Sequence, residues 1–267
     1  MKKSSIGIIG VGFVGGAVKF WFDSKPEFPL HIYDKFKKLG SIAAVNTADI
    51  IFVCVPTPYG KKGYDDSAVL DALSNIRDGK TVVIKSTVVP GSTERYQKQF
   101  PKLKIMFNPE FLVAKNANQD FVTPDRQIIG YTAKSKSEAK KVLAVLPPAP
   151  FVKTVPATDA EMIKYFGNTF LATRVVFANQ MYDLCEAIGA DYEAVKEAAA
   201  ADARIGASHF TIFHDGYRGY AGACLPKDTR AIIDFGKKQK NRMELLERVE
   251  EINNKLISKA KKRDHKS

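Results

Sequence analysis

The sequence predicts an α/β fold, with a doubly wound parallel sheet in the first half of the chain and an all-helical second half. Short apolar strands alternate with helical stretches from residue 6 to about residue 155, and a glycine-rich turn joins the first strand to the first helix. Beyond residue 156, apolar residues recur at the three- and four-residue intervals of amphipathic helices. We therefore expect one domain over residues 1–155, a helical domain over 156–256 and a basic tail over 257–267.

The composition is that of an ordinary globular protein. The 267 residues are 45% hydrophobic, which is enough to bury a core. No apolar run approaches the length of a membrane span, and the N-terminal residues lead directly into a glycine motif. We expect a cytoplasmic protein with no membrane partner. Its three cysteines are widely spaced, which suits reduced thiols and indicates neither disulfides nor a metal site.

The net charge of +12 raises the question of a nucleic-acid partner. Much of the excess lies in "KSKSEAKK" and in the tail "KLISKAKKRDHKS", where solvated lysines are the simpler interpretation. We expect no nucleic-acid partner. A small phosphorylated substrate would also suit this charge.

The stretch "SSIGIIGVGFVGGAVKFWF" contains a dinucleotide-binding pattern of the Rossmann type. Gly10 permits a tight turn, Gly12 lets the backbone approach a pyrophosphate, and Gly15 lets the helix pack closely on the strand. Phe13 and Val14 begin the helix whose N-terminus faces the phosphates. The alternative is a glycine turn that holds no ligand.

The second strand, "LHIYD", ends in Asp34. A carboxylate at that place hydrogen-bonds the ribose hydroxyls of the cofactor and repels a 2′-phosphate, so we expect NAD rather than NADP. Lys35, Lys37 and Lys38 follow directly and weaken that preference.

The later strands end in polar or turn-forming clusters. They lie in "DIIFVCVPTP", "KTVVIKSTVVPG", "KIMFNPEF", "RQIIGYT" and "FVKTV". Because ligands bind at the carboxyl ends of parallel strands, we expect Thr57, Thr87 and Glu110 to point toward one crevice. Each of the three, taken alone, is equally typical of a turn or helix cap. Cys54 lies within an apolar strand and is interpreted as an inert core thiol.

The second half begins with a long helix predicted over "TDAEMIKYFGNTFLATRVVFANQMYDLCEAIGA", with Thr158 or Asp159 as its cap. Lys164 and Asn168 are spaced i, i+4 and share one face, where two donors would stabilise a developing oxyanion. An ordinary polar helix face is the alternative interpretation. Cys185 has apolar neighbours and is expected to serve packing.

A reactive thiol is predicted in "GACLPKDTRAIIDFG". Pro226 is favoured at the first helical position, and Asp228 falls in the first turn, where it could also serve only as a cap. Cys224 therefore precedes a helix N-terminus, where the pKa of a thiol falls.

The motifs together resemble the UDP-glucose/GDP-mannose dehydrogenase family of nucleotide-sugar 6-dehydrogenases. The matching motifs follow the family's order from residue 6 to about residue 256: "GVGFVG", "VPTP", "KSTVVPGST", "NPEFL", "PDRQIIG", "EMIKYFGNTFLA", "CEAIGAD" and "GACLPKD". The resemblance implies an NAD-dependent oxidation of a sugar C6 alcohol to a carboxylate in two steps, with two NAD consumed per sugar.

The resemblance also implies roles for individual residues. Cys224 matches the nucleophile that forms a thiohemiacetal and then a thioester, and Lys164 and Asn168 match the groups that hold the C6 oxygen. Glu110 matches the carboxylate that handles water during thioester hydrolysis. The remaining implied roles are polar active-site neighbours (Thr87 and Asp228), cofactor contacts (Thr57, Thr87 and Lys227) and substrate contacts (Glu110, Phe111, Leu112, Lys164, Asn168, Tyr220 and Gly222).

Four positions depart from the family pattern. Val113 and Ala114 stand where an arginine and a glutamate are usual, and Arg218 and Ala221 stand where an apolar residue and a glycine are usual. We interpret these departures as changes that alter the substrate rather than abolish the chemistry.

The last stretch, "RMELLERVEEINNKLISKAKKRDHKS", resembles the long helix that joins and dimerises family members, so a homodimer through this helix is expected. The family's C-terminal substrate-covering domain does not follow it in the sequence. Three expectations arise: a separate chain completes the cleft, the enzyme takes an unusual substrate, or the chain binds NAD without full turnover.

The resulting functional prediction is oxidation of UDP-glucose to UDP-glucuronate, a reaction of polysaccharide biosynthesis. GDP-mannose and UDP-N-acetylmannosamine are the alternative substrates. From a different class, the alternative is a catalytically incomplete NAD-binding relative that acts with a partner chain.

Overall fold

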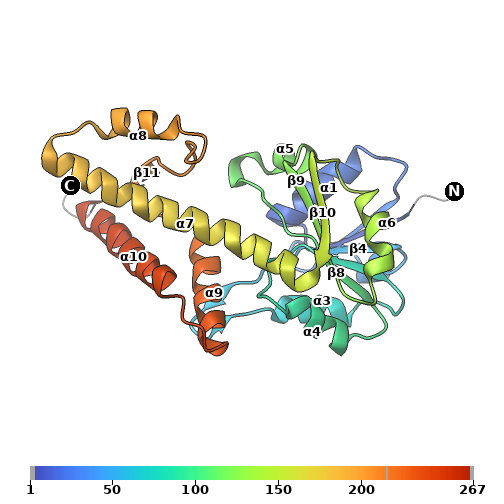
Figure 1. Ribbon diagram of the computed structural model, residues 1–267. Helices are drawn as coiled ribbons and strands as arrows, with labels where there is room; N and C mark the ends of the chain where they lie inside the picture. Colours follow the sequence, from blue (N-terminus) through green and yellow to red (C-terminus); the bar gives the residue numbers. More distant parts are fainter. Residues whose placement is uncertain (1–3, 215, 265–267) are drawn as a thin grey trace. The chain divides into compact units, whose positions relative to one another are not determined.

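A computed structural model describes residues 4–214 and 216–264 of the chain. The chain divides into two compact units, residues 1–164 and 165–267 (Figure 1). The first unit contains a large sheet covered by helices on both faces, and the second is mainly helical. The predicted α/β class, with a helical second half, is confirmed.

Within the described ranges, eight strands form the main sheet, in the order β10-β9-β8-β7-β4-β1-β2-β3. Their bounds are β1 (Ile6–Ile9), β2 (Leu30–Asp34), β3 (Leu39–Gly40), β4 (Ile50–Val53), β7 (Thr81–Ile84), β8 (Lys104–Phe107), β9 (Arg126–Tyr131) and β10 (Phe151–Pro156). The predicted strands are all present. A separate hairpin pairs β5 (Tyr59–Gly60) with β6 (Gly63–Tyr64).

The expectation of a wholly parallel sheet was wrong at two junctions. β3 returns antiparallel to β2 through a tight turn in which Lys38 has a φ of 54°. β9 runs antiparallel to β8, with Phe107 paired with Gly130. The connection between β8 and β9 contains only the short helices η1 (Ala114–Asn116) and α5 (Ala117–Val122), and α5 packs against α1 instead of crossing over the sheet.

Alternating strand residues supply two apolar layers. In β4, Ile50 and Phe52 face one layer, while Ile51 and Val53 face the other. The first layer is covered by α1 (Phe13–Asp23), α5 and α6 (Ala139–Leu143), the last of which follows η2 (Lys136–Glu138). The second layer is covered by α2 (Ile42–Val45), α3 (Ser67–Ser74), α4 (Ser92–Gln99) and the start of α7.

The long helix predicted for the second half is confirmed as α7 (Ala157–Ile188). It begins directly after β10, so Thr158 and Asp159 lie inside its first turn, and the prediction that one of them precedes the helix as a cap was wrong. The other helices of this half are α8 (Tyr192–Ala200), α9 (Leu225–Lys238) and α10 (Glu244–Asp264). A hairpin of β11 (Phe213–His214) and β12 (Tyr217–Arg218) interrupts the predicted all-helical region.

Helices α7 and α10 present their apolar residues differently. The apolar residues Leu246, Val249 and Leu256 of α10 are buried. The described part of α7, in contrast, exposes apolar side chains at intervals of four and seven residues: Phe166, Phe170, Phe177, Leu184 and Ile188. The larger exposed apolar face in the second unit therefore belongs to α7.

The cysteines differ in burial. Cys54 and Cys185 are buried, Cys185 in an apolar cluster of the second unit, as predicted for packing residues, and Cys224 is exposed. Across the described residues, no helix has the length and apolar character needed to cross a membrane.

The turn after β1 leads to a prediction about stability. A Cβ atom added at Gly15 would lie 1.8 Å from the carbonyl oxygen of Gly10, whereas one at Gly16 would meet nothing within 4 Å. We predict that Gly15→Ala lowers the free energy of unfolding by about 3 kcal/mol or more, because backbone must move. Denaturant unfolding measures this change.

The neighbouring Gly16→Ala variant is the matched control. It replaces a helical glycine where space is open, so it should raise the free energy of unfolding by up to about 1 kcal/mol. Equal effects of the two substitutions would contradict this account of the turn.

Candidate active site

A cavity of about 890 Å³ in the first unit lies over the glycine turn. Gly10, Gly12, Phe13, Val14 and Asp34 line it. A Cβ at Gly12 would meet no atom within 4 Å, so the backbone at the start of α1 is open to a close ligand. The size of the cavity, the open backbone and the helix N-terminus suit a dinucleotide. Gly15 lies behind this surface, packed against Gly10.

Asp34 connects the end of β2 to the glycine turn. Its Oδ2 accepts a hydrogen bond from the Val11 amide at 2.8 Å, and its Oδ1 accepts from the amides of Phe36 and Lys37 at 3.0 and 2.9 Å. Burial opposes ionisation, but these three amides outweigh it and hold the pKa of Asp34 below its usual value. Asp34 is therefore a carboxylate within the cavity wall.

The lysines after Asp34 have partners of their own. Lys37 donates to the carbonyl oxygen of Val11 at 2.7 Å, and Lys35 lies 3.9 Å from the carboxylate of Asp71. These contacts reduce the charge that the lysines offer to a 2′-phosphate. They support the NAD preference predicted from Asp34.

Cys54 also lines this cavity, a position that the sequence did not predict. Burial raises the pKa of its thiol to about 12, so the thiol stays neutral at pH 7. This agrees with the interpretation of Cys54 as an inert thiol.

Glu110 and Lys164 form a buried ion pair in the first unit. The ammonium group of Lys164 lies 2.8 Å from Oε1 of Glu110 and donates to the Glu110 carbonyl oxygen at 2.7 Å. The amide of Leu112 donates to Oε2 of Glu110 at 2.9 Å. Burial opposes ionisation of Glu110, but the charge and hydrogen bond of Lys164, together with the Leu112 amide, hold the pKa of Glu110 below its usual value.

Glu161, which the sequence reasoning missed, fixes the helical turn that carries Lys164. Its carboxylate accepts hydrogen bonds from the amide of Gly91 at 2.6 Å and from the amide and hydroxyl of Thr93 at 2.8 and 2.6 Å. These donors lie at the N-terminus of α4, where a carboxylate is favoured. Burial raises the pKa of Glu161 to about 7 despite the three donors.

Lys85, at the end of β7, is a second missed residue. Its buried ammonium group donates to the Asn108 side chain at 2.7 Å, and burial lowers the pKa of Lys85 to about 8. Its charge also helps to keep Glu110 ionised. The sequence contained a signal for this residue, because the lysine in "VVIKSTVV" directly follows an apolar strand, at the strand end where ligands bind.

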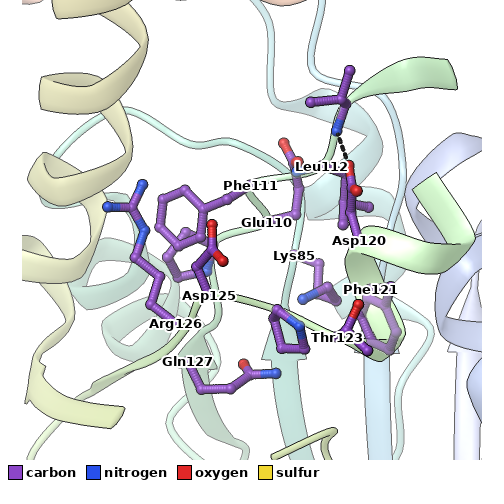
Figure 2. A pocket seen from close by; sticks show the side chains of 13 residues that line it. Lys85, Glu110, Phe111, Leu112, Asp120, Phe121, Thr123, Asp125, Arg126 and Gln127 are labelled. Carbon is purple, nitrogen blue, oxygen red and sulfur yellow. Dashed lines mark hydrogen bonds between the residues drawn. The ribbon is translucent and has the colours of Figure 1, made fainter. Parts of the chain in front are cut away.

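A second cavity, of about 370 Å³, lies beside the ion pair, and Lys85, Glu110, Phe111 and Leu112 line part of it (Figure 2). The antiparallel register of β9 brings Arg126 to Phe111, and the guanidinium carbon lies 3.8 Å from the ring centroid. The sequence analysis gave Arg126 no role. In a parallel strand, Arg126 would lie at the amino ends of the neighbouring strands, away from Phe111.

The loop after Glu110 is pinned by a single acidic side chain. The amide of Val113 donates to Oδ2 of Asp120 at 2.7 Å, the dashed bond in Figure 2. The Val113 side chain itself is exposed. The departure from arginine at this position therefore leaves the backbone of the loop anchored.

Thr57 and Thr87 are joined to each other. The Thr57 hydroxyl donates to the Thr87 carbonyl oxygen at 2.8 Å, and the Tyr64 hydroxyl donates to the same oxygen at 3.3 Å. The Thr57 hydroxyl thus braces the turn after β7. Contacts of either threonine with cofactor or substrate stay predictions.

Cys224 lies in the second unit as the N-cap residue of α9, and its side chain is exposed. The helix begins at Leu225, so Pro226 occupies the second helical position rather than the first. Cys224 is thus at a helix N-terminus, as predicted.

Asp228 in the first turn of α9 binds two predicted site residues. Its side chain is 1% exposed, accepts a hydrogen bond from Asn168 and forms an ion pair with Lys227, each at 2.5 Å. Asp228 is therefore more than a cap. A contact of Lys227 with the cofactor stays a prediction.

Arg218 is bound within its own unit. It donates to the Asn179 side chain and carbonyl oxygen at 2.9 and 3.0 Å and pairs with Asp183 at 2.7 Å. This departure from the family pattern is therefore explained by local structure. Tyr220 is buried and Gly222 is exposed with a φ of 82°.

The predicted site residues thus form two groups. The first unit brings together Glu110, Phe111, Leu112 and Lys164, and holds the cofactor cavity. The second unit brings Asn168 of α7 together with Lys227 and Asp228 of α9, the helix that Cys224 precedes. Within the described residues, no cluster of three or more metal-ligating side chains occurs.

The chain is similar to known dehydrogenases. Residues 30–145 match the NAD binding domain of the UDP-glucose/GDP-mannose dehydrogenase family, and residues 158–255 match its central domain. The UDP-glucose 6-dehydrogenase TuaD of Bacillus subtilis is 33% identical over 225 residues, 80% of this chain and 48% of TuaD. The UDP-glucose 6-dehydrogenase of Pseudomonas aeruginosa is 36% identical over 228 residues, 77% of this chain and 48% of that protein.

The chain is also similar to a dehydrogenase of solved structure. A UDP-glucose dehydrogenase from Pyrobaculum islandicum superposes with a TM-score of 0.83 and 29% identity, covering 94% of this chain and 68% of that one. The chain spans about half the length of the curated relatives it matches. The NAD cofactor predicted from Gly10, Gly12 and Asp34 is confirmed by the domain match. The chain belongs to the UDP-glucose/GDP-mannose dehydrogenase family.

Proposed function

We propose that the chain acts as an NAD-dependent nucleotide-sugar 6-dehydrogenase that oxidises UDP-glucose to UDP-glucuronate. One observation carries the proposal. An exposed thiol, Cys224, stands at the N-terminus of α9, whose first turn holds a buried Asp228 bound to Asn168. A reactive thiol in such a setting suits covalent capture of an aldehyde.

In the proposed first oxidation, the C6 hydroxyl passes its proton to solvent water and C6 passes a hydride to the cofactor, which leaves an aldehyde. Lys164 and Asn168 donate hydrogen bonds to the C6 oxygen. An ammonium group carries three N–H bonds, and the contacts with the Glu110 carbonyl and carboxylate involve two of them. NAD, when bound over Gly12, supplies the hydride acceptor for each oxidation.

In the proposed second oxidation, the Cys224 thiolate adds to C6 of the aldehyde, and the oxygen takes up a proton to give a thiohemiacetal. The aldehyde is thus retained on the protein while the reduced cofactor is exchanged. Loss of a hydride from C6 and a proton from the oxygen then gives a thioester on Cys224.

In the proposed last step, Glu110 takes a proton from water as that water attacks the thioester carbonyl. The C–S bond breaks, which releases the carboxylic acid and restores the thiolate. Lys164 and Lys85 suit Glu110 to this role, because their charges favour its ionised form. An ionised carboxylate is the form that can accept a proton.

The alternatives are a different nucleotide sugar, GDP-mannose or UDP-N-acetylmannosamine, and an incomplete NAD-binding relative that acts with a partner chain. The similarity to the UDP-glucose 6-dehydrogenases of Bacillus subtilis and Pseudomonas aeruginosa favours UDP-glucose. A cytoplasmic homodimer serving polysaccharide biosynthesis remains our expectation. The exposed apolar face of α7 supports placing the dimer contact there rather than on α10, where Leu246, Val249 and Leu256 are buried and Leu245 is exposed.

The central test of this function uses a panel of nucleotide sugars. With NAD present, the protein should reduce NAD with one UDP- or GDP-sugar. Cys224→Ser should lose sustained NADH production, because no thioester can form and the second oxidation is blocked. Absorbance of NADH measures both. Cys185→Ala, which alters a buried thiol in the same unit, is the control and should retain activity.

Failure of the function has a defined outcome in this assay. If the protein binds NAD but produces no NADH with any sugar of the panel, the incomplete relative replaces the enzyme. If Cys224→Ser turns over as the parent does, the covalent mechanism is wrong.

The cofactor preference is tested through Asp34. We predict that kcat/KM with NAD exceeds that with NADP by about tenfold or more, since the buried carboxylate repels a 2′-phosphate. Asp34→Ala should lower kcat/KM for NAD and reduce the ratio. Asp78→Ala, which removes an exposed carboxylate of the first unit that does not line this cavity, is the control. Preferential turnover of NADP by the parent would contradict the prediction.

A further inference from the structure

The segment between β12 and Cys224 has few side chains to hold it. We refer to residues 219–223 as the Cys224 loop. Gly219 and Gly222 have φ values of 85° and 82°, and Ala221 and Ala223 offer only methyl groups. Such backbone is costly to order, so its conformation depends on anchors outside the loop.

Asn253 of α10 supplies an anchor at two points. Its Oδ1 accepts a hydrogen bond from the Tyr220 amide at 2.7 Å, and its Nδ2 donates to the Tyr220 carbonyl oxygen at 2.9 Å. One side chain therefore satisfies both backbone groups of one residue, as a neighbouring β-strand would. Asn253 is 0% exposed, and hydrogen bonds lost at such a site leave buried polar groups unpaired.

The loop approaches Asn253 as closely as glycine permits. A Cβ at Gly219 would lie 2.5 Å from Oδ1 of Asn253 and 3.3 Å from Cβ of Leu256. Position 219 thus requires glycine because of its positive φ and because of α10. The fit is specific to this pair of residues.

The same helix also holds the chain after Cys224. The Tyr220 hydroxyl donates to Oε2 of Glu250 at 2.9 Å, and Oε1 of Glu250 pairs with Arg230 of α9 at 2.5 Å. Glu250 lies one turn before Asn253 on α10. Residues of α10 thus contact the chain four residues before Cys224 and six residues after it.

We propose that Asn253 is a positioning residue for Cys224, and that α10 sets the geometry of the reactive thiol through the Cys224 loop. The inference rests on the proposed function, because it takes Cys224 as the nucleophile. It assigns the buried face of α10 a role in the site of its own chain, distinct from the dimer contact expected from the sequence.

The test compares Asn253→Ala and Gly219→Ala with Lys255→Ala. The first two disrupt the contact between α10 and the loop, one from each side. The third changes an exposed side chain of the same helix that pairs with Glu251. For the first two we expect kcat to fall by about ten- to a hundredfold, because small displacements of a reacting group have effects of this size. The Kd for NAD should stay unchanged, since the cofactor cavity lies in the first unit. Lys255→Ala should match the parent.

Two readouts independent of turnover separate this proposal from the proposed function. Amide hydrogen exchange in Asn253→Ala should rise by about tenfold or more over residues 217–224 and stay unchanged in the first unit. Alkylation of Cys224 by iodoacetamide, followed by peptide mass spectrometry, should slow by about threefold or more as the thiol leaves the helix N-terminus. Cys54 and Cys185 are the buried internal references.

The proposal is overturned by any of three results. One is parental kcat in Asn253→Ala, another is parental alkylation of Cys224, and the third is an exchange increase over the whole second unit, which indicates unfolding rather than a local change. If the parent itself makes no NADH, the proposed function fails, while the exchange and alkylation results still decide the role of Asn253.

Discussion

The buried ion pair between Glu110 and Lys164 is the interaction on which the candidate site of the first unit depends. It joins the loop after β8 to the second turn of α7 at a place where neither charge reaches much water. Removing one partner from such a pair leaves an uncompensated buried charge, at a cost of about 3–5 kcal/mol. Glu161, three residues before Lys164 in the same helix, binds that helical turn to the N-terminus of α4.

Stability alone does not account for such a concentration of buried charge. Apolar side chains of similar volume are often as stabilising as a buried ion pair, or more so. The first unit nevertheless buries Lys85, Glu110, Glu161 and Lys164, and the second buries Asp228. Of these groups, Lys85, Glu110 and Glu161 have pKa values shifted from the usual ones, and perturbed ionisable groups are concentrated at functional sites. The shifts support the proton transfer that we propose for Glu110.

The sequence predicted features that depend on local periodicity and spacing. The strands, α7, the glycine turn, Asp34 and the helix after Cys224 follow from neighbouring residues. The sequence did not predict that β9 runs antiparallel to β8, because this direction depends on how the segment between the two strands packs. The contact of Arg126 with the Phe111 ring was therefore missed. The role of Asn253 was missed for a similar reason, because its partner is the backbone of Tyr220, 33 residues away in the sequence. Arg218 was interpreted as a change in substrate recognition because its contacts with Asn179 and Asp183 cannot be read from spacing.

The proposed mechanism requires that a thioester on Cys224 is hydrolysed with Glu110 as the base. Mass spectrometry of the Cys224 peptide from Glu110→Gln, after incubation with NAD and UDP-glucose, tests this step. We expect a sugar-nucleotide acyl adduct on Cys224, formed with a burst of NADH that then stops. Asp125→Asn, a carboxylate variant in the same cavity, should turn over without accumulating the adduct. Sustained NADH production by Glu110→Gln with an unmodified Cys224 would show that Glu110 is not the base.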